Sequence, residues 1–142
     1  MDRTECLALL ESAQLGRLAC ARDGQPYVVP VSMAVMGEDI VGFSLEGQKV
    51  EWMRANPKVC IQVDEFDKGR GWRSVVAYGR FEELPDRIGW KVEREKARSV
   101  LAQSAEWWLP GGLKPVAKSR TSPLFFRIVI DEITGRRAQQ GD

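Results

Sequence analysis

The Asp-Gly pair at residues 23 and 24 lies between two runs of alternating side chains, and it constrains the fold more than any other feature. Glycine tolerates the positive φ that a two-residue hairpin turn requires, so the pair predicts a tight turn between antiparallel strands. We therefore expect strands over Leu15–Ala21 and Tyr27–Val35. In the second strand, a period of two places side chains on two faces. One face carries Tyr27, Val29, Val31, Met33 and Val35; the other carries Val28, Pro30, Ser32 and Ala34.

Pro30 interrupts the hydrogen-bonding capacity of this second strand, because proline has no backbone N–H to donate. We expect this part of the strand to lie at an edge, at a bulge or where the sheet opens. An opening of that kind is where a ligand could enter.

The remaining elements follow from periodicity, caps and turn residues. Asp2 and Glu5 have the spacing of a capping box and predict a helix over Thr4–Ser12. Further strands are expected over Asp39–Ser44, Val59–Asp64, Arg73–Glu83 and Leu124–Glu132. Helices are expected over Lys49–Ala55 and from Pro85 and Asp86 to about Gln103, with a loop at Glu65–Gly71, a turn at Thr134-Gly135 and a frayed tail over residues 136–142.

Six strands joined mostly by short turns predict a mainly β fold. We expect an antiparallel six-stranded barrel with flanking helices, because closure of the sheet removes exposed edges. The pattern alone does not separate a barrel from a sandwich. A chain of 142 residues has the length of one domain, so residues 1–142 are expected to share a single core.

The composition excludes several classes of protein. A net charge of +1 gives no reason to expect nucleic-acid binding, which depends on positive charge. No apolar run approaches the roughly 20 residues that span a bilayer, and the N-terminus MDRTEC lacks the pattern of a signal peptide. We therefore expect a cytoplasmic protein without a membrane partner.

The cysteine and histidine counts restrict the chemistry. Cys6, Cys20 and Cys60 are an odd number at wide spacing in apolar stretches, which predicts buried, reduced thiols. The sequence has no histidine. That absence removes Ser-His-Asp and Cys-His nucleophiles, the usual zinc hydrolase sets and His-ligated haem, so we predict no metal site and no catalytic side chain of these kinds. Chemistry must come from a cofactor or from carboxylates.

The stretch Tyr27–Glu51 contains the candidate binding residues. Two strands that feed a short helix would bring Ser32, Ser44, Gln48 and Lys49 toward one end of the sheet, where the Arg73-Ser74 strand can meet them. The N–H groups at a helix N-terminus and a lysine both favour an anion, so this grouping predicts a phosphate site. The alternatives are a solvated helix start and an Arg73 that pairs with Glu51 or Glu82 on the surface.

Four segments carry a family resemblance in their order and spacing: GRLACARDGQPYVVPVS, GFSLEGQKVEWMRANPKVCIQVDE, WRSVVAYGRFEEL and FFRIVIDEITGRRA. Together they resemble the FMN-binding split-barrel proteins of the pyridoxamine 5'-phosphate oxidase type, especially the small bacterial members grouped with nitroimidazole-resistance proteins. The resemblance implies a homodimer with flavin mononucleotide (FMN) bound between the subunits.

The resemblance also implies roles by position. The segment Pro30-Val31-Ser32 would run beneath the flavin ring, and Phe43 and Ser44 would line the ribityl and phosphate side. The other implied contacts are Gln48 and Lys49 to the phosphate, Ser74 beside Arg73 to the phosphate or ring, and Trp107 and Trp108 as a cover from the second subunit.

Three departures from the family pattern bear on activity. Gln48 stands where the family commonly has a basic residue, and Phe43 stands about where many nitroimidazole-resistance relatives have a histidine. The C-terminal ITGRRAQQGD lacks the arginine pattern of true pyridoxamine-phosphate oxidases, so we do not expect that activity.

Two functions remain from the sequence. The resemblance implies a flavin-dependent oxidoreductase that acts on an unknown small molecule, with the flavin supplying the chemistry. The alternative is a non-catalytic flavin-binding or sensor protein, or a cofactor-free dimeric module. A deazaflavin in place of FMN stays open.

Overall fold

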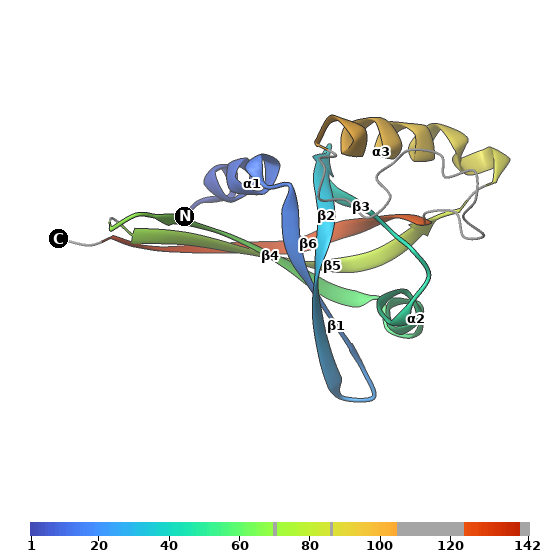
Figure 1. Cartoon of the computed structure of the whole chain (residues 1–142), viewed down its shortest axis with the longest axis horizontal. Helices are drawn as coiled ribbons and strands as arrows, with labels where there is room; N and C mark the ends of the chain where they lie inside the picture. Colours follow the sequence, from blue (N-terminus) through green and yellow to red (C-terminus); the bar gives the residue numbers. More distant parts are fainter. Residues whose placement is uncertain (70, 86, 105–123, 140–142) are drawn as a thin grey trace.

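The computed structural model describes residues 1–69, 71–85, 87–104 and 124–139 (Figure 1). The strands of these residues are β1 (Leu15–Arg22), β2 (Gln25–Met36), β3 (Asp39–Ser44), β4 (Lys58–Asp67), β5 (Gly71–Leu84) and β6 (Leu124–Gln139). The helices are α1 (Arg3–Ser12), α2 (Gln48–Ala55) and α3 (Lys91–Ser104), with a short 3₁₀ helix η1 (Ile88–Trp90) before α3. The six strands close into a barrel in the order β1-β2-β3-β6-β5-β4, and each neighbouring pair is antiparallel. This confirms the predicted split β-barrel with flanking helices.

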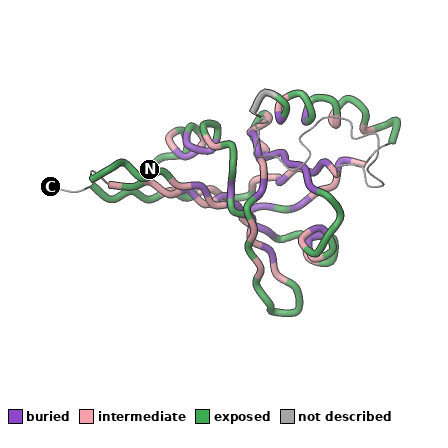
Figure 2. The backbone as a smooth tube through the Cα atoms, viewed as in Figure 1, coloured by how far each residue is buried: buried purple, intermediate pink, exposed green. Residues whose placement is uncertain are grey.

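The β1–β2 hairpin turns where the sequence predicts it. Asp23 and Gly24 have φ values of 51° and 80°, which is the pair of positive angles that a two-residue hairpin turn needs. The hairpin extends away from the rest of the barrel, and its tip is exposed (Figures 1 and 2).

Strand β2 has one paired edge along its first two thirds. Residues Gln25–Ser32 pair with β1 alone, whereas residues Met33–Met36 pair with β3. The two strands separate beyond Gly42, where a Cβ would lie 2.6 Å from the Phe126 ring and 3.0 Å from the carbonyl oxygen of Ser32. Pro30 lies in the part with a free edge, as predicted. The barrel is therefore split between β2 and β3.

Strands β4, β5 and β6 continue past the barrel as a three-stranded arm (Figure 1). The predicted loop at Glu65–Gly71 is wrong in its first half, because β4 pairs with β5 as far as Asp67. An ion pair of 2.9 Å between Glu65 and Arg73 joins the two strands there. Polar side chains are compatible with this segment because both faces of the arm reach solvent near its end.

The predicted turn at Thr134-Gly135 and the frayed tail after it are wrong as far as Gln139. Strand β6 runs through both and pairs with β5 down to Gly71. Gly135 lies beneath α1, where a Cβ would be 2.6 Å from Cys6 Sγ and 3.0 Å from Met1 Sδ. The glycine thus leaves space for α1 to pack on β6, and it does not form a turn. Residues 140–142 of the predicted tail lie outside the described residues.

The long helix begins later than predicted. Arg87 has an extended backbone (φ −135°, ψ 155°), and η1 precedes α3, which starts at Lys91. Gly89 within η1 disfavours regular α-helix at this point. The Trp90 ring also contacts the Arg127 guanidinium on β6, 5.8 Å from the ring centroid.

The core has two parts. The larger fills the barrel and extends under α1 and α2, with Leu18, Met33, Ile61 and Phe126 at its centre. The smaller lies between α3 and β3 and consists of Ala34, Val41, Phe43, Leu84, Ala97, Leu101 and Phe125. Cys6 and Cys20 are buried, Cys60 is half-buried and all three are free, in agreement with the predicted reduced thiols. Among the described residues, no helix has the length and apolar character to cross a membrane.

Candidate functional site

Strand alternation divides the predicted site residues between faces of the sheet. We define the outer face of the sheet as the face that carries Arg17 and Gln62. Pro30, Ser32 and Ser74 lie on this face. The strand register shows it, through the pairs Leu15↔Ser32, Arg17↔Pro30, Arg17↔Gln62 and Asp64↔Ser74. Directly paired residues of antiparallel strands share a face. Val31 and Arg73 point to the opposite face, whereas Phe43 shares the outer face with Ser32 but lies under α3.

Each of these three side chains has another environment. Val31 is buried in the barrel core. The Phe43 ring is buried beneath α3, with its centroid 6.3 Å from that of Phe125. Arg73 forms a surface ion pair with Glu65, which is the alternative to a binding role but with a partner other than Glu51 or Glu82. These side chains therefore contribute to the fold at positions where the neighbouring residue can face a ligand.

Four polar side chains from three strands form a connected group on the outer face, which we call the Arg17 network. Arg17 donates to Gln62 Oε1 and to Asp64 Oδ2, both at 3.0 Å. Gln62 Nε2 donates to Asp64 Oδ2 at 2.9 Å and to Ser74 Oγ at 3.0 Å. Ser74 is thereby connected to Arg17, whose strand partner is Pro30.

A hollow of about 350 Å³ lies beside this network. Its apolar walls come from β1 and from the free-edged part of β2, and its charged walls are Arg17 and Asp64; the lining residues are Leu15, Gly16, Arg17, Val28, Val29, Pro30 and Asp64. A mostly apolar cavity with a few convergent polar groups is the usual form of a small-molecule site.

The remaining predicted residues lie at the N-terminal end of α2. Gly47 is the N-cap and supplies no side-chain hydrogen bond, so the first N–H groups of the helix have no capping side chain. Gln48 is exposed and Lys49 is half-buried. Ser44, at the end of β3, is buried, and its hydroxyl donates to the Leu45 carbonyl at 2.8 Å. We call Gly47, Gln48 and Lys49 the α2 start.

An ion-pair cluster holds the α2 start in position. Arg54, in the last turn of α2, donates to Glu46 at 2.8 Å and also pairs with Glu83 on β5. Hydrogen bonds from the guanidinium to these two carboxylates, to Glu83 foremost, raise the pKa of Arg54, so the guanidinium stays charged. At the other end of α2, Asn56 Nδ2 donates to the Ala21 carbonyl of β1 at 3.1 Å.

Lys49 is the cation of the α2 start. Burial lowers the pKa of its ammonium, and the opposing effect of an ionised Cys20 on that pKa is smaller. Burial likewise raises the pKa of the Cys20 thiol, which therefore stays protonated at neutral pH and supplies no counter-charge. Within the described part of the chain, no carboxylate forms an ion pair with Lys49. The position suits an anionic ligand, because a phosphate would supply the missing charge.

The structure brings the predicted residues together in two groups. Pro30, Ser32 and Ser74 belong with the Arg17 network, whereas Gln48 and Lys49 belong with the α2 start. The two groups lie beside opposite faces of β1: Lys49 lies beside Cys20, whereas Arg17, three residues away and about 10 Å along the strand, points to the outer face. Trp107 and Trp108 lie outside the described residues.

Sequence reasoning missed Arg17, Gln62 and Asp64. Each is a polar residue on the outward side of a largely apolar strand, and that pattern was the available signal. Their connection depends on the register of β1 against β4 and of β4 against β5, across separations of up to 47 residues. No local pattern specifies such a register.

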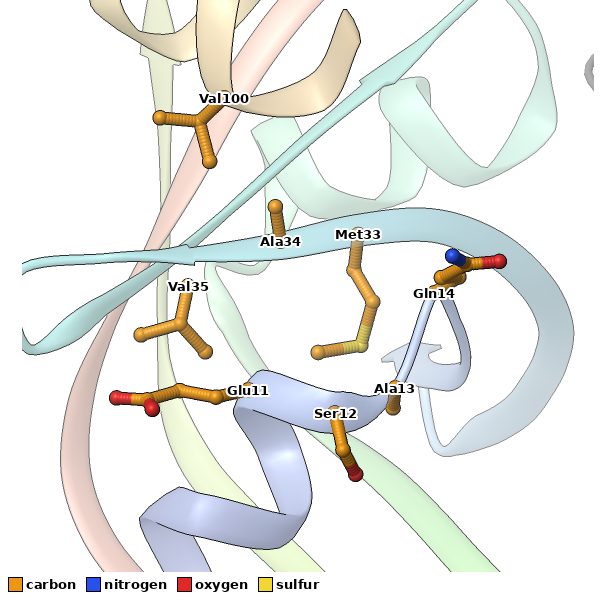
Figure 3. Close-up of a pocket in the computed structure, with 8 residues that line it drawn as sticks. All are labelled: Glu11, Ser12, Ala13, Gln14, Met33, Ala34, Val35 and Val100. Carbon is orange, nitrogen blue, oxygen red and sulfur yellow. The ribbon is translucent and has the colours of Figure 1, made fainter. Parts of the chain in front are cut away.

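A second hollow, of about 370 Å³, lies between the end of α1, β2 and α3. Figure 3 shows Met33 and Val35 pointing toward α1 while Ala34 points toward Val100 of α3. Glu11 is the charged residue in its lining, and none of the predicted site residues lines it. It lacks a cation for a phosphate, so the candidate site is the combination of the Arg17 network, the free edge of β2 and the α2 start.

The fold and this site define a class of protein: an antiparallel split barrel that presents a lysine at an uncapped helix start. The family model described as pyridoxamine 5'-phosphate oxidase matches residues 2–137. The chain therefore belongs to that family.

Three proteins from bacteria are similar to this chain. An uncharacterized protein of Rhizobium meliloti (strain 1021) is 46% identical over 145 residues, which cover 100% of this chain and 96% of the relative. A crystal structure of an FAD-binding protein from Mesorhizobium loti is 50% identical, with a TM-score of 0.82 and coverage of 97% of this chain and 96% of that one. A candidate 5-nitroimidazole antibiotic resistance protein from Bacteroides thetaiotaomicron shares the fold at 19% identity, with a TM-score of 0.73 over 96% of this chain and 84% of that chain.

Proposed function

We propose that this protein binds a flavin nucleotide, FMN by our prediction, and acts as a flavin-dependent oxidoreductase on a small molecule. The observation that carries the proposal is Lys49: a half-buried ammonium without a carboxylate partner, at an uncapped helix start beside the opening between β2 and β3. Family membership and the FAD-binding relative at 50% identity support a flavin as the phosphorylated ligand. FMN and FAD both carry a phosphate after the ribityl chain, so the α2 start suits either.

The chain's own residues have binding roles in this proposal. Lys49 and the free N–H groups of α2 hold the phosphate, and the free edge of β2 lies along the ring at Pro30 and Ser32. Bound flavin supplies the electron and hydride chemistry. This division of labour requires no acid or base from a chain that contains no histidine.

We also propose that a second copy of the chain covers the outer face and completes the site. Five large apolar side chains are 39% to 74% exposed there: Leu15, Val28, Phe66, Trp72 and Tyr78. Large apolar side chains exposed on one face of a sheet are typical of protein interfaces. The three free thiols are compatible with a reducing compartment, the cytoplasm in our proposal.

The test is the absorption spectrum of the purified protein, followed by mass identification of any bound compound. We expect a flavin spectrum, FMN by mass, and a dimer by sedimentation equilibrium. FAD in place of FMN would correct the choice of nucleotide and leave flavin binding intact. A colourless protein that does not quench the fluorescence of added FMN or FAD would refute the proposal.

The competing function is a flavin carrier or sensor. It is favoured by Gln48, a neutral and exposed residue at a position where the family commonly has a basic one. Turnover decides between the two: an oxidoreductase must pass electrons from a nicotinamide nucleotide or redox protein to an acceptor repeatedly. Reduction without reoxidation by any acceptor would favour the sensor.

A further inference from the structure

The hydrogen bonds of the Arg17 network leave a defined set of groups unused. Gln62 uses both of its N–H groups, which donate to Asp64 and to Ser74, and one lone pair of its oxygen, which accepts from Arg17. Asp64 accepts both of its bonds on Oδ2, so within the described part of the chain Oδ1 has no donor. Gln62 thus holds its neighbours in place and has no N–H left to donate to a ligand.

The groups that remain form a donor–acceptor–donor set. Arg17 donates through Nη1 and keeps further N–H groups. Asp64 offers the acceptor Oδ1. Ser74 accepts from Gln62, so its own hydroxyl proton is free to be donated. The three groups come in this order across β1, β4 and β5.

We propose that this set binds the imide edge of the flavin ring, with Arg17 and Ser74 donating to its two carbonyl oxygens and Asp64 accepting from the N3–H between them. The inference rests on the proposed flavin binding and assigns the residues that recognise the ring. An imide presents acceptor, donor and acceptor in sequence, which is the complement of the set on the outer face. A planar heterocycle without that N–H cannot satisfy Asp64.

The adjacent hollow has the size and lining for the ring. Its volume of about 350 Å³ is near the lower end for small-molecule sites, which suits a ring system better than a whole dinucleotide. Leu15, Val28 and Pro30 supply apolar surface for the flat faces of the ring, and Arg17 and Asp64 supply polar groups at its side. Pro30 belongs to the strand segment that family resemblance places beneath the flavin.

Gln62 is a positioning residue in this arrangement. Its three hydrogen bonds connect Arg17, Asp64 and Ser74, which come from three strands. Half-satisfied polar groups at a buried ligand edge are costly, so the fixed geometry favours one hydrogen-bonding pattern over others.

The experiment compares FMN with 3-methyl-FMN, in which a methyl group replaces the N3 hydrogen. Fluorescence quenching gives both dissociation constants for the full-length chain and for its Asp64→Ala, Gln62→Leu and Glu65→Ala variants. We expect the unaltered protein to prefer FMN by about tenfold or more, because the methylated ring leaves a carboxylate oxygen unpaired. Asp64→Ala and Gln62→Leu should reduce that preference to within about threefold.

Glu65→Ala is the matched control, since Glu65 is the adjacent carboxylate on β4 but pairs with Arg73 on the opposite face. It should keep the full preference. Equal binding of the two ligands by the unaltered protein, a comparison that needs no variant to fold, would overturn the inference while flavin binding stands. A preference that survives Asp64→Ala would overturn it as well. If neither ligand binds, the proposed function itself fails.

Discussion

The α2 start and the Arg17 network recognise a ligand by different physics. The α2 start presents uncompensated positive charge: Lys49 has no carboxylate partner in the described part of the chain, and the helix has no capping side chain. The Arg17 network is internally paired, with Arg17 and Asp64 3.0 Å apart, and presents a pattern of donors and acceptors instead. The first should respond to the charge of a ligand and the second to its hydrogen-bonding edge.

Lys49→Ala should produce the largest change, and only for phosphorylated ligands. A hydrogen bond to a charged group contributes roughly 1.5–3 kcal/mol, so FMN affinity should fall about 10- to 100-fold. Riboflavin has the same ring without the phosphate and should bind within about twofold of the unaltered protein, since the Arg17 network is unchanged. Fluorescence titration with both ligands measures the two losses.

Lys58→Ala is the control for this change, because Lys58 is an exposed lysine just beyond the other end of α2. It should leave both affinities unchanged. Equal losses for FMN and riboflavin in Lys49→Ala would remove Lys49 from the phosphate and with it the contrast between the two groups.

The sequence was informative about the α2 start because its signals are local. The Asp23-Gly24 turn, the bounds of β3 and the free edge at Pro30 all follow from residues within a few positions of one another. A helix that follows a strand and begins with Gln48 and Lys49 can be recognised in the same way. The burial of the Lys49 side chain lowers the pKa of its ammonium. This burial depends on contacts with β1 and could not be predicted from the local sequence.

The outer face was harder to predict because it depends on register. Arg17, Gln62 and Ser74 each look like ordinary polar residues of separate strands until the strands are aligned. The prediction of a turn at Gly135 failed for a similar reason. Glycine after threonine indicates a turn locally, but here the glycine makes room for Cys6 of α1, which lies 129 positions earlier in the chain. Alternation predicted which side chains share a strand face, and only the fold shows which faces meet.

The charge of Lys49 should also make the two groups differ with pH. Its pKa is lowered in the folded chain, so the unfolded chain binds its proton more tightly and the ligand-free protein carries a stability penalty at neutral pH. That penalty is present in full below the folded pKa and declines as the pH rises toward the ordinary pKa of lysine. Lys49→Met should therefore raise the stability of the ligand-free protein at neutral pH while weakening FMN binding.

Urea unfolding at neutral and alkaline pH measures this effect. The gap between Lys49→Met and the unaltered protein should shrink as the pH rises, and FMN affinity of the unaltered protein should fall over the same interval, with riboflavin affinity steady. A Lys49→Met protein that is less stable at neutral pH would mean that the ammonium has a stabilising partner and is not held for a ligand.

The smallest change should come from Gln48→Arg, which adds the basic residue common in the family at this position. Gln48 is exposed, and interactions between exposed charges are worth about 0.2–1 kcal/mol, so FMN should bind about 1.5- to 5-fold more tightly. Riboflavin affinity should not change. Gln14→Arg adds the same charge at the exposed residue after α1 and should leave FMN binding unaltered, which separates a contact at the α2 start from an effect of net charge. If both variants strengthened FMN binding equally, the gain would be long-range attraction, and it would disappear in high salt, whereas a contact at the α2 start would persist in part.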